Sequence, residues 1–314
     1  MDFTRNLKYF FILPALLVVL SLAAVLAWGL KPGIDLAGGS LMQITYLAER
    51  PEPEAVRTVT EALGLGEVRV QPSGTQGFIL RQRDLSVDER ATLSGALASL
   101  GEVREDQFTS IGPSLGAELL RKAWIAIGLV VLCTVLFIAF AFRRPSRDEK
   151  EGEKREGVSS WKYGIVAIVT LLHDIILPVG LFALLGHLYG AEVDALFIVA
   201  LLTILGISIN DTIVIFDRIR ENLRLGEEHR RHESFEHVVS RSISQTISRS
   251  INTSLTVIIV LAALYFVGPA ATQNFALTLI VGMIAGTYSS IFLASPLLVA
   301  WEHFSARKLA GSKK

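Results

Sequence analysis

The sequence has one cysteine, Cys133, and little charge among its 314 residues. A single cysteine excludes an internal disulfide framework and a cysteine-based zinc site. Basic and acidic residues each total 30, so the chain lacks the basic excess that is typical of a nucleic-acid-binding protein. Charged residues make up only 19% of the chain and the mean hydropathy is +0.48, which indicates that much of it lies in a bilayer.

The motifs of several enzyme classes are also missing. The sequence contains no H-E-x-x-H and no P-loop. The histidines His229, His232 and His237 lie in an arginine-rich segment without carboxylates at the usual ligand spacing. We therefore expect no enzyme activity, no metal site and no bound cofactor.

Long uncharged stretches predict six membrane-spanning helices, because a span needs about 20 mostly apolar residues. Three runs contain no charged residue: 9–30, 123–142 and 250–301. The last run is long enough for two spans, which we expect to be joined near Gly268 and Pro269. Two more apolar stretches lie between Tyr163 and Phe216, on either side of residues 186–194.

The distribution of lysine and arginine predicts the orientation in the membrane. Of the 30 residues, 20 lie at the N-terminus, after spans two and four, and in the tail, while the loops after spans three and five contain none. Because cytoplasmic loops are rich in lysine and arginine, we expect both termini in the cytoplasm. The expected organisation is a first transmembrane helix (1–30), an extracytoplasmic domain (31–118), a second transmembrane helix (119–142), a cytoplasmic linker (143–162), transmembrane helices three to six (163–301) and a cytoplasmic tail (302–314).

The extracytoplasmic segment shows the order β-α-β-β-α-β. Strand-like patterns cover 40–48, 67–70, 78–83 and 102–111, and helices are expected to begin at 51–54 and 86–89. Ser86 and Glu89 have the spacing of a capping box. This order is that of a ferredoxin-like α+β domain. The sequence therefore predicts a polytopic α-helical membrane protein with six transmembrane helices and a ferredoxin-like domain between the first two.

Ionisable side chains interrupt the apolar spans. Asp174, beside His173, lies about 17 Å into span three, and Asp211 lies about 24 Å into span four. Arg249 begins span five, and its depth can match that of Asp211. A charge at the centre of a span costs about 2.5–3.5 kcal/mol, so such residues are functional candidates. A motion that changed the distance from Asp211 to Arg249 would make the carboxyl take up and release a proton.

A purely structural interpretation stays open for these polar groups. Asp174 has His173 as a local partner, and an arginine at the end of a span satisfies the orientation rule by itself. Asn210 and Thr212, which flank Asp211, are expected to support it or simply to form hydrogen bonds between helices.

Two helix faces are also predicted. Gly282, Gly286 and Ser290 recur at intervals of four in span six, which is typical of a small-residue face for helix packing. Before span five, the apolar residues Phe235, Val239, Ile243 and Ile247 share one face. We expect this segment to lie along the membrane surface or to act as a plain connector.

Five segments together resemble the SecF family of the bacterial SecD–SecF protein-export complex, which is related to the resistance-nodulation-division transporters. They are Gly-Ile-Asp-Leu-Ala-Gly-Gly at 33–39, Leu-His-Asp at 172–174, the long stretch 208–222, Gln-Thr-Ile-Ser-Arg-Ser at 245–250 and Gly-Thr-Tyr-Ser-Ser at 286–290.

The resemblance implies a SecD partner, the SecY–SecE–SecG channel, the SecA motor, preprotein substrates and membrane lipids, and no nucleic acid. It implies a bacterial plasma (inner) membrane location and protons as the coupling ion. By motif, Asp211 is the proton-relay carboxylate, Arg249 its basic neighbour and Asp174 a secondary site in the relay. Gly33, Asp35, Gly38 and Gly39 are expected to shape the turn into the outside domain, because glycine permits unusual backbone angles.

Two other functions stay open. One is a proton-coupled small-molecule exporter subunit of the same superfamily, although a single outside domain of this size leaves little room for a drug pocket. The other is a structural assembly factor of the translocon, which would not need an ionisable Asp211.

Overall fold

The computed structural model describes residues 3–66, 68–141, 160–229 and 233–311. Most of the expected cytoplasmic linker (143–159) and the end of the tail (312–314) lie outside the described residues. The chain divides into two compact units. The helical unit comprises Met1–Leu30, Ala126–Ala191 and Val199–Lys314, and the sheet unit comprises Lys31–Ile125 and Glu192–Ile198.

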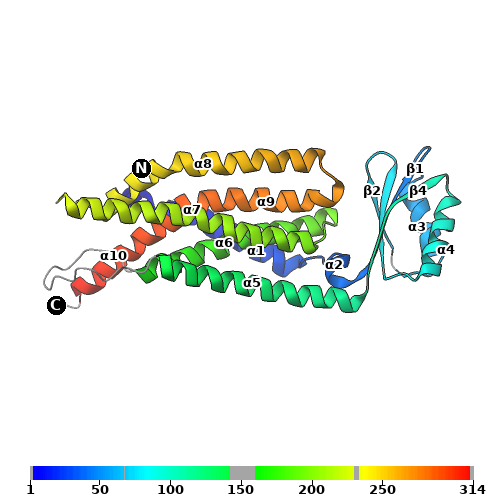
Figure 1. Cartoon of the computed structure of the whole chain (residues 1–314), viewed down its shortest axis with the longest axis horizontal. Coiled ribbons are helices and arrows are strands. Elements are labelled where there is room, and N and C mark those ends of the chain that lie inside the picture. Colours follow the sequence, from blue (N-terminus) through cyan, green and yellow to red (C-terminus); the bar gives the residue numbers. More distant parts are fainter. Residues whose placement is uncertain (1–2, 67, 142–159, 230–232, 312–314) are drawn as a thin grey trace. The chain divides into compact units, whose positions relative to one another are not determined.

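The helical unit is built from long apolar helices (Figure 1), of which α5 and α7 begin in the sheet unit. They are α1 (Phe3–Trp28), α5 (Pro113–Ala141), α6 (Ser160–Tyr189), α7 (Ala195–Glu228), α8 (Phe235–Val267), α9 (Ala270–Ser289), the π-helical turn η1 (Ser290–Ala294) and α10 (Ser295–Gly311). Helices α9 and α10 with η1 make one span, so the described residues contain six helices long and apolar enough to cross a membrane. The predicted number of spans is confirmed, and α8 and α9 are joined at Gly268 and Pro269.

Helix α8 corrects one expectation. It is continuous, and its early apolar face does not lie along the membrane surface. Val239 and Ile243 are buried in a core that includes Ile215 and Ile219 of α7. The face is apolar because it packs against α7, which a spacing pattern alone does not distinguish from membrane contact.

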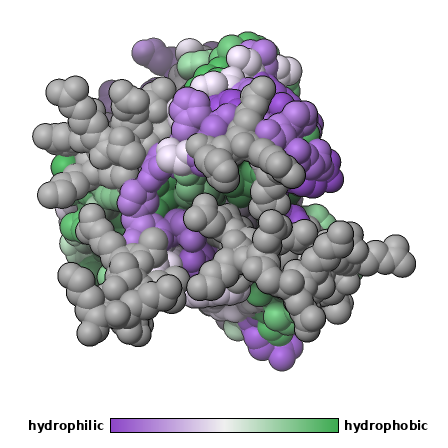
Figure 2. Space-filling model, turned by 90° about the vertical axis from the view of Figure 1, so that its left-hand side faces the viewer, coloured by the Kyte–Doolittle hydropathy of each residue, from purple (hydrophilic) through white to green (hydrophobic). Residues whose placement is uncertain are grey.

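Hydrophilic side chains gather at the end of the helical unit where α7 ends and α8 begins (Figure 2). Ion pairs join neighbouring residues there, among them Arg218 with Glu221 at 2.6 Å and Arg241 with Glu233 at 2.9 Å. Lys162 of α6 also pairs with Glu302 of α10, at 2.7 Å. These charges mark where the apolar part of the helices ends.

The sheet unit contains α2 (Ile34–Ala37), β1 (Gly39–Tyr46), α3 (Pro53–Glu61), β2 (Arg69–Ser73), β3 (Gly77–Gln82), α4 (Val87–Ala98) and β4 (Val103–Ile111). All strand pairs are antiparallel in the order β2-β3-β1-β4, and α3 and α4 lie on the same side of the sheet (Figure 1). The core between sheet and helices includes Met42, Tyr46, Phe78, Leu80 and Leu93. This is the predicted ferredoxin-like order.

The helix boundaries in the sheet unit follow local chemistry. Ser86 and Glu89 form the expected capping box, in which each side chain satisfies a backbone N–H of the other residue. Strand β2 continues through Pro72 to Ser73, further than the pattern indicated, because it lies at the sheet edge, where proline is tolerated.

Candidate functional site

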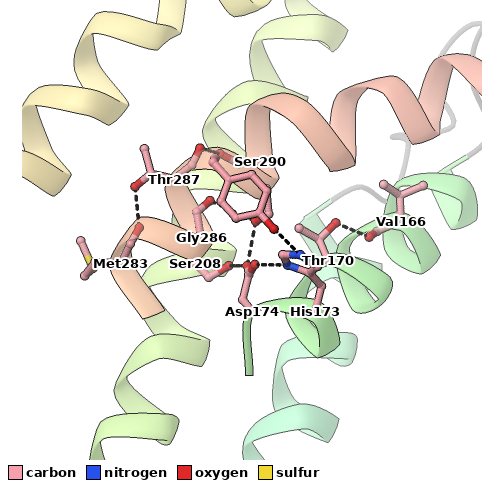
Figure 3. Close-up of polar contacts among 11 residues, drawn as sticks. Val166, Thr170, His173, Asp174, Ser208, Met283, Gly286, Thr287 and Ser290 are labelled. Atoms are coloured by element: carbon pink, nitrogen blue, oxygen red, sulfur yellow. Dashed lines mark hydrogen bonds and ion pairs between the residues drawn. The ribbon is translucent and has the colours of Figure 1, made fainter. Parts of the chain in front are cut away.

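Asp174 lies at the centre of a polar network inside the helical unit. Its side chain comes from α6 and is completely buried. One carboxylate oxygen, Oδ1, lies 2.9 Å from Nδ1 of His173. The other, Oδ2, accepts hydrogen bonds from Ser289 Oγ of α9 at 2.9 Å and from Ser208 Oγ of α7 (Figure 3). Three helices therefore meet at this carboxylate, and each supplies at least one of its hydrogen-bond partners.

The imidazole of His173 extends the network to a tyrosine. Its second ring nitrogen, Nε2, is hydrogen-bonded to the hydroxyl of Tyr288 on α9, and the two rings meet edge to face with centroids 5.3 Å apart. Both nitrogens of His173 thus have partners, which fixes the ring. The π-helical turn η1 begins two residues after Tyr288. Such turns are frequent at functional sites.

Asp211 differs from Asp174 in its hydrogen bonding. Its side chain is buried with 7% exposure, one turn after Ser208 on α7. It lines a narrow crevice against α9, together with Met283 and Thr287. Within the described residues, its carboxylate makes no hydrogen bond. Asp174 is consequently a fixed and satisfied carboxylate, whereas Asp211 is a buried carboxylate without such a partner.

Arg249 does not form a contact ion pair with Asp211. It lies exposed on α8, and among the described residues no ion pair joins it to Asp211. Asp174 is linked to the same part of α7, because Ser208, which lies one turn before Asp211, donates a hydrogen bond to it. The structure therefore links the two predicted carboxyls, Asp174 and Asp211, through Ser208, and it shows no bond from Arg249 to either of them among the described residues.

The residues that flank Asp211 point in different directions. Asn210 is exposed, whereas Thr212 is buried. A hydrogen bond between helices is made instead by Thr287 of α9, whose hydroxyl donates to Ser254 of α8 at 2.6 Å.

The small residues of span six pack closely on α7. A Cβ atom at Gly282 would lie 2.2 Å from Ile204, and one at Gly286 would lie 3.1 Å from Ser208. Ser290 is buried and donates to the carbonyl of Thr287. The approach at Gly286 places α9 near enough for Ser289 and Ser208 to reach the same carboxylate.

The glycines after α1 also have identifiable roles within the sheet unit. Gly38 and Gly39 have φ angles of +80° and +138°, which favour glycine. A Cβ at Gly39 would lie 2.6 Å from the carbonyl oxygen of Gln82. Gly33 allows a close approach of Val193, and Asp35 accepts a hydrogen bond from the amide of Ala195 at 3.1 Å.

No group of three potential ligands suited to a metal ion occurs among the described residues. His232 lies outside them.

Three residues of the network were given no role from the sequence: Ser208, Tyr288 and Ser289. All three lie within the segments 208–222 and 286–290 that carry the family resemblance, and that resemblance was the available signal for them. Spacing alone does not show that all three converge on Asp174 and His173.

The fold and site together define a class: a polytopic membrane protein with a buried polar network in its helical core and a ferredoxin-like domain after its first span. A family model described as "Protein export membrane protein SecD/SecF, C-terminal" matches residues 159–303. The curated relatives include the protein translocase subunit SecF of Thermobaculum terrenum, which is 41% identical over 96% of this chain and 94% of its own. That of Anaerolinea thermophila is 35% identical over 93% of this chain and 91% of its own.

A solved structure agrees with these relatives. The crystal structure of SecDF from Thermus thermophilus, titled a translocon-associated membrane protein, is 33% identical and superposes with a TM-score of 0.81. The match covers 96% of this chain and 39% of the SecDF chain. The chain belongs to the SecF family of protein translocase subunits.

Proposed function

We propose that this protein acts with a SecD partner at the Sec translocon and couples proton movement to the export of unfolded preproteins. The SecDF chain is more than twice as long as the region that this protein matches. A separate SecD subunit would supply the remaining part. The SecY–SecE–SecG channel and SecA are the expected wider partners, in the bacterial inner membrane.

The observation that carries the proton-coupling proposal is the state of Asp211. A buried carboxylate without a hydrogen-bond partner is costly when charged, so its protonation responds to small changes in its surroundings. Arg249 makes no ion pair with Asp211 among the described residues, so a movement of α8 would change the distance between the two groups. Bringing the guanidinium nearer would favour release of the proton, and withdrawing it would favour uptake.

The orientation that the charges predict belongs to the same proposal. The hydrophilic end shown in Figure 2, where α7 ends and α8 begins, would face the cytoplasm, with both termini. Residues 31–118 would then be extracytoplasmic, as the distribution of lysine and arginine predicts, on the side where an exported chain emerges.

The test uses inverted membrane vesicles that contain this protein with its SecD partner and the Sec channel. Asp211→Asn keeps the size of the side chain and removes its titration. We expect it to insert and to bind SecD, but to abolish the stimulation of preprotein release by the proton gradient. Asp217→Asn is the matched control, because Asp217 is an exposed carboxylate on the same helix.

Three outcomes distinguish the candidate functions. Loss of stimulation in Asp211→Asn alone supports proton coupling. Full stimulation in that variant rules out the relay role of Asp211. Failure of Asp211→Asn to assemble with SecD, while Asp217→Asn assembles, would favour a structural assembly factor.

A further inference from the structure

Residues 192–195, at the end of the loop between α6 and α7 and the start of α7, are joined to the rest of the sheet unit by backbone hydrogen bonds, ion pairs and a helix cap. Residues 192–195 of this loop belong to the sheet unit by their contacts. The amide of Val193 donates to the carbonyl of Lys31 at 2.8 Å, and the amide of Gly33 donates to the carbonyl of Val193 at 2.8 Å. These two bonds form a short parallel bridge between the turn after α1 and the loop before α7.

Glu192 attaches the same loop to the sheet. Its carboxylate lies 3.1 Å from Nε of Arg81 on β3 and 3.4 Å from Nη1 of Arg69 on β2. Only 10% of the Glu192 side chain is exposed, whereas that of Arg69 is 55% exposed. One buried carboxylate therefore joins two neighbouring strands to the loop.

Asp35 attaches the first residue of α7. The first amides of a helix have no partner within the helix. Asp35 Oδ2 accepts a hydrogen bond from the amide of Ala195, and Asp194 Oδ1 accepts one from the amide of Phe197 at 2.8 Å. Carboxylates at this end also interact favourably with the helix dipole. The cap at Ala195 comes from outside the helix and its own loop, so it ties α7 to the turn at 33–39.

Helix α7 is the helix that carries Asp211. It is continuous from Ala195 to Glu228, and Asp211 lies 16 residues after its first residue, a rise of about 24 Å. Displacement of the first turn of such a helix is transmitted along it, because its hydrogen bonds resist stretching. We infer that Glu192 and Asp35 are positioning residues that couple movement of the sheet unit to α7 and so to Asp211. This inference rests on the proposed proton relay and adds the connection by which proton movement would drive the sheet unit.

Two measurements in the same vesicles test it: the stimulation of preprotein release by the gradient, and proton uptake through the complex. Glu192→Lys places a cation against Arg69 and Arg81 and should separate the loop from the sheet. We expect release per proton to fall by about tenfold while proton uptake continues. Glu192→Gln keeps one acceptor oxygen, so it can accept from one of the two guanidinium groups, and it should lower release per proton less than Glu192→Lys does.

Ala195→Pro tests the helix cap without a charge change. Proline is tolerated at the first position of a helix but has no N–H, so it removes the bond to Asp35 and leaves α7 intact. It should also lower release per proton. The control is Glu61→Lys, because Glu61 pairs with Arg57 on α3, away from residues 192–195.

The results separate this inference from the proposed function. Asp211→Asn should abolish both release stimulation and proton uptake, whereas the loop variants should lose only the link between them. Normal release per proton in both Glu192→Lys and Ala195→Pro would overturn the inference, even with an inactive Asp211→Asn. Loss of coupling in Glu61→Lys as well would overturn it too, since a general disturbance of the sheet unit would then explain the result.

Discussion

Ser289 of α9 donates a hydrogen bond of 2.9 Å to Oδ2 of Asp174, which lies on α6 and is completely buried. The same oxygen accepts a hydrogen bond from Ser208 of α7. Two hydroxyl groups from two other helices therefore share one oxygen of a single carboxylate. This sharing makes the position of α9 relative to α7 depend on Asp174, and it places the network one turn from Asp211.

The first prediction concerns these two serines. Ser208→Ala and Ser289→Ala should each destabilise the folded protein by about 1 kcal/mol, because each removes one donor from a buried carboxylate. The double variant should cost more than the sum, because Oδ2 then loses both donors. Thermal unfolding in detergent measures the effect. Strictly additive losses would show that the two hydrogen bonds are independent.

The second prediction concerns Tyr288. Tyr288→Phe removes the hydroxyl bound to His173 and leaves the aromatic ring contact. We expect a lower maximal rate of gradient-stimulated release with unchanged SecD binding, because the imidazole that holds Asp174 loses one of its two partners. Tyr265→Phe on α8 is the matched control, since Tyr265 packs on Phe266 away from this network. Equal rates in the two variants would remove Tyr288 from the site.

The third prediction tests the packing of α9 on α7. Gly282→Ala places a Cβ atom 2.2 Å from Ile204, so the helices must separate or the side chain must leave its rotamer. Overpacking of this kind costs about 1–3 kcal/mol. Gly206→Ala is the control, because nothing lies within 4 Å of its added Cβ. The melting temperature should fall for Gly282→Ala and should stay the same or rise for Gly206→Ala.

The fourth prediction is a dependence on pH in the loop at 192–195. Burial raises the pKa of Glu192 above its usual value of 4.5, although Arg81 and Arg69 oppose this shift. Burial likewise raises the pKa of Asp194, to which the nearby Asp35 contributes. Such carboxyls bind protons more tightly in the folded state than in the unfolded state. Their contribution to stability therefore increases as the pH falls from 7 toward 4.5.

Hydrogen exchange at the amides of Gly33 and Val193, corrected for the intrinsic rate, measures this dependence. We expect the corrected exchange rate of these two amides to be no faster at pH 5 than at pH 7. Glu89 should show the opposite dependence of stability on pH, because a hydrogen bond from Arg83 lowers its pKa to about 2. Its contribution is lost as the pH falls below 4.5, so exchange at the amide of Ser86, which donates to Glu89, should accelerate there. Faster exchange at the amide of Val193 when the pH is lowered from 7 to 5 would contradict a raised pKa of Glu192 and Asp194.

Much of the fold was predictable because the relevant signals are local. The length of an apolar run defines a span, and the capping box at Ser86 and Glu89 defines a helix start by chemistry within four residues. The ferredoxin-like order followed from the order of strands and helices. The apolar face at the start of α8, with Val239 and Ile243, could not be interpreted in this way. Its spacing identifies an apolar stripe but does not show whether α7 or lipid covers it.

The candidate site was predictable only as a set of residue types at given depths. From the sequence alone, Asp174 and Asp211 are two carboxylates in apolar spans, with an arginine at the end of the next span. The rotation of α6, α7 and α9 about their axes determines which of the two carboxylates receives hydrogen bonds. Hydrogen bonds form only within a few tenths of an ångström of one distance, and no spacing rule gives that precision.

The sequence by itself determined the six spans, the ferredoxin-like domain and the burial of Asp174 and Asp211, because hydrophobicity and helical rise act along the chain. The tertiary structure alone decided that Ser208 and Ser289 converge on Asp174, that Asp211 has no hydrogen bond within the described residues, and that Glu192 joins Arg69 and Arg81. These residues are far apart in the chain, and only the packing of helices and strands brings their side chains within bonding distance.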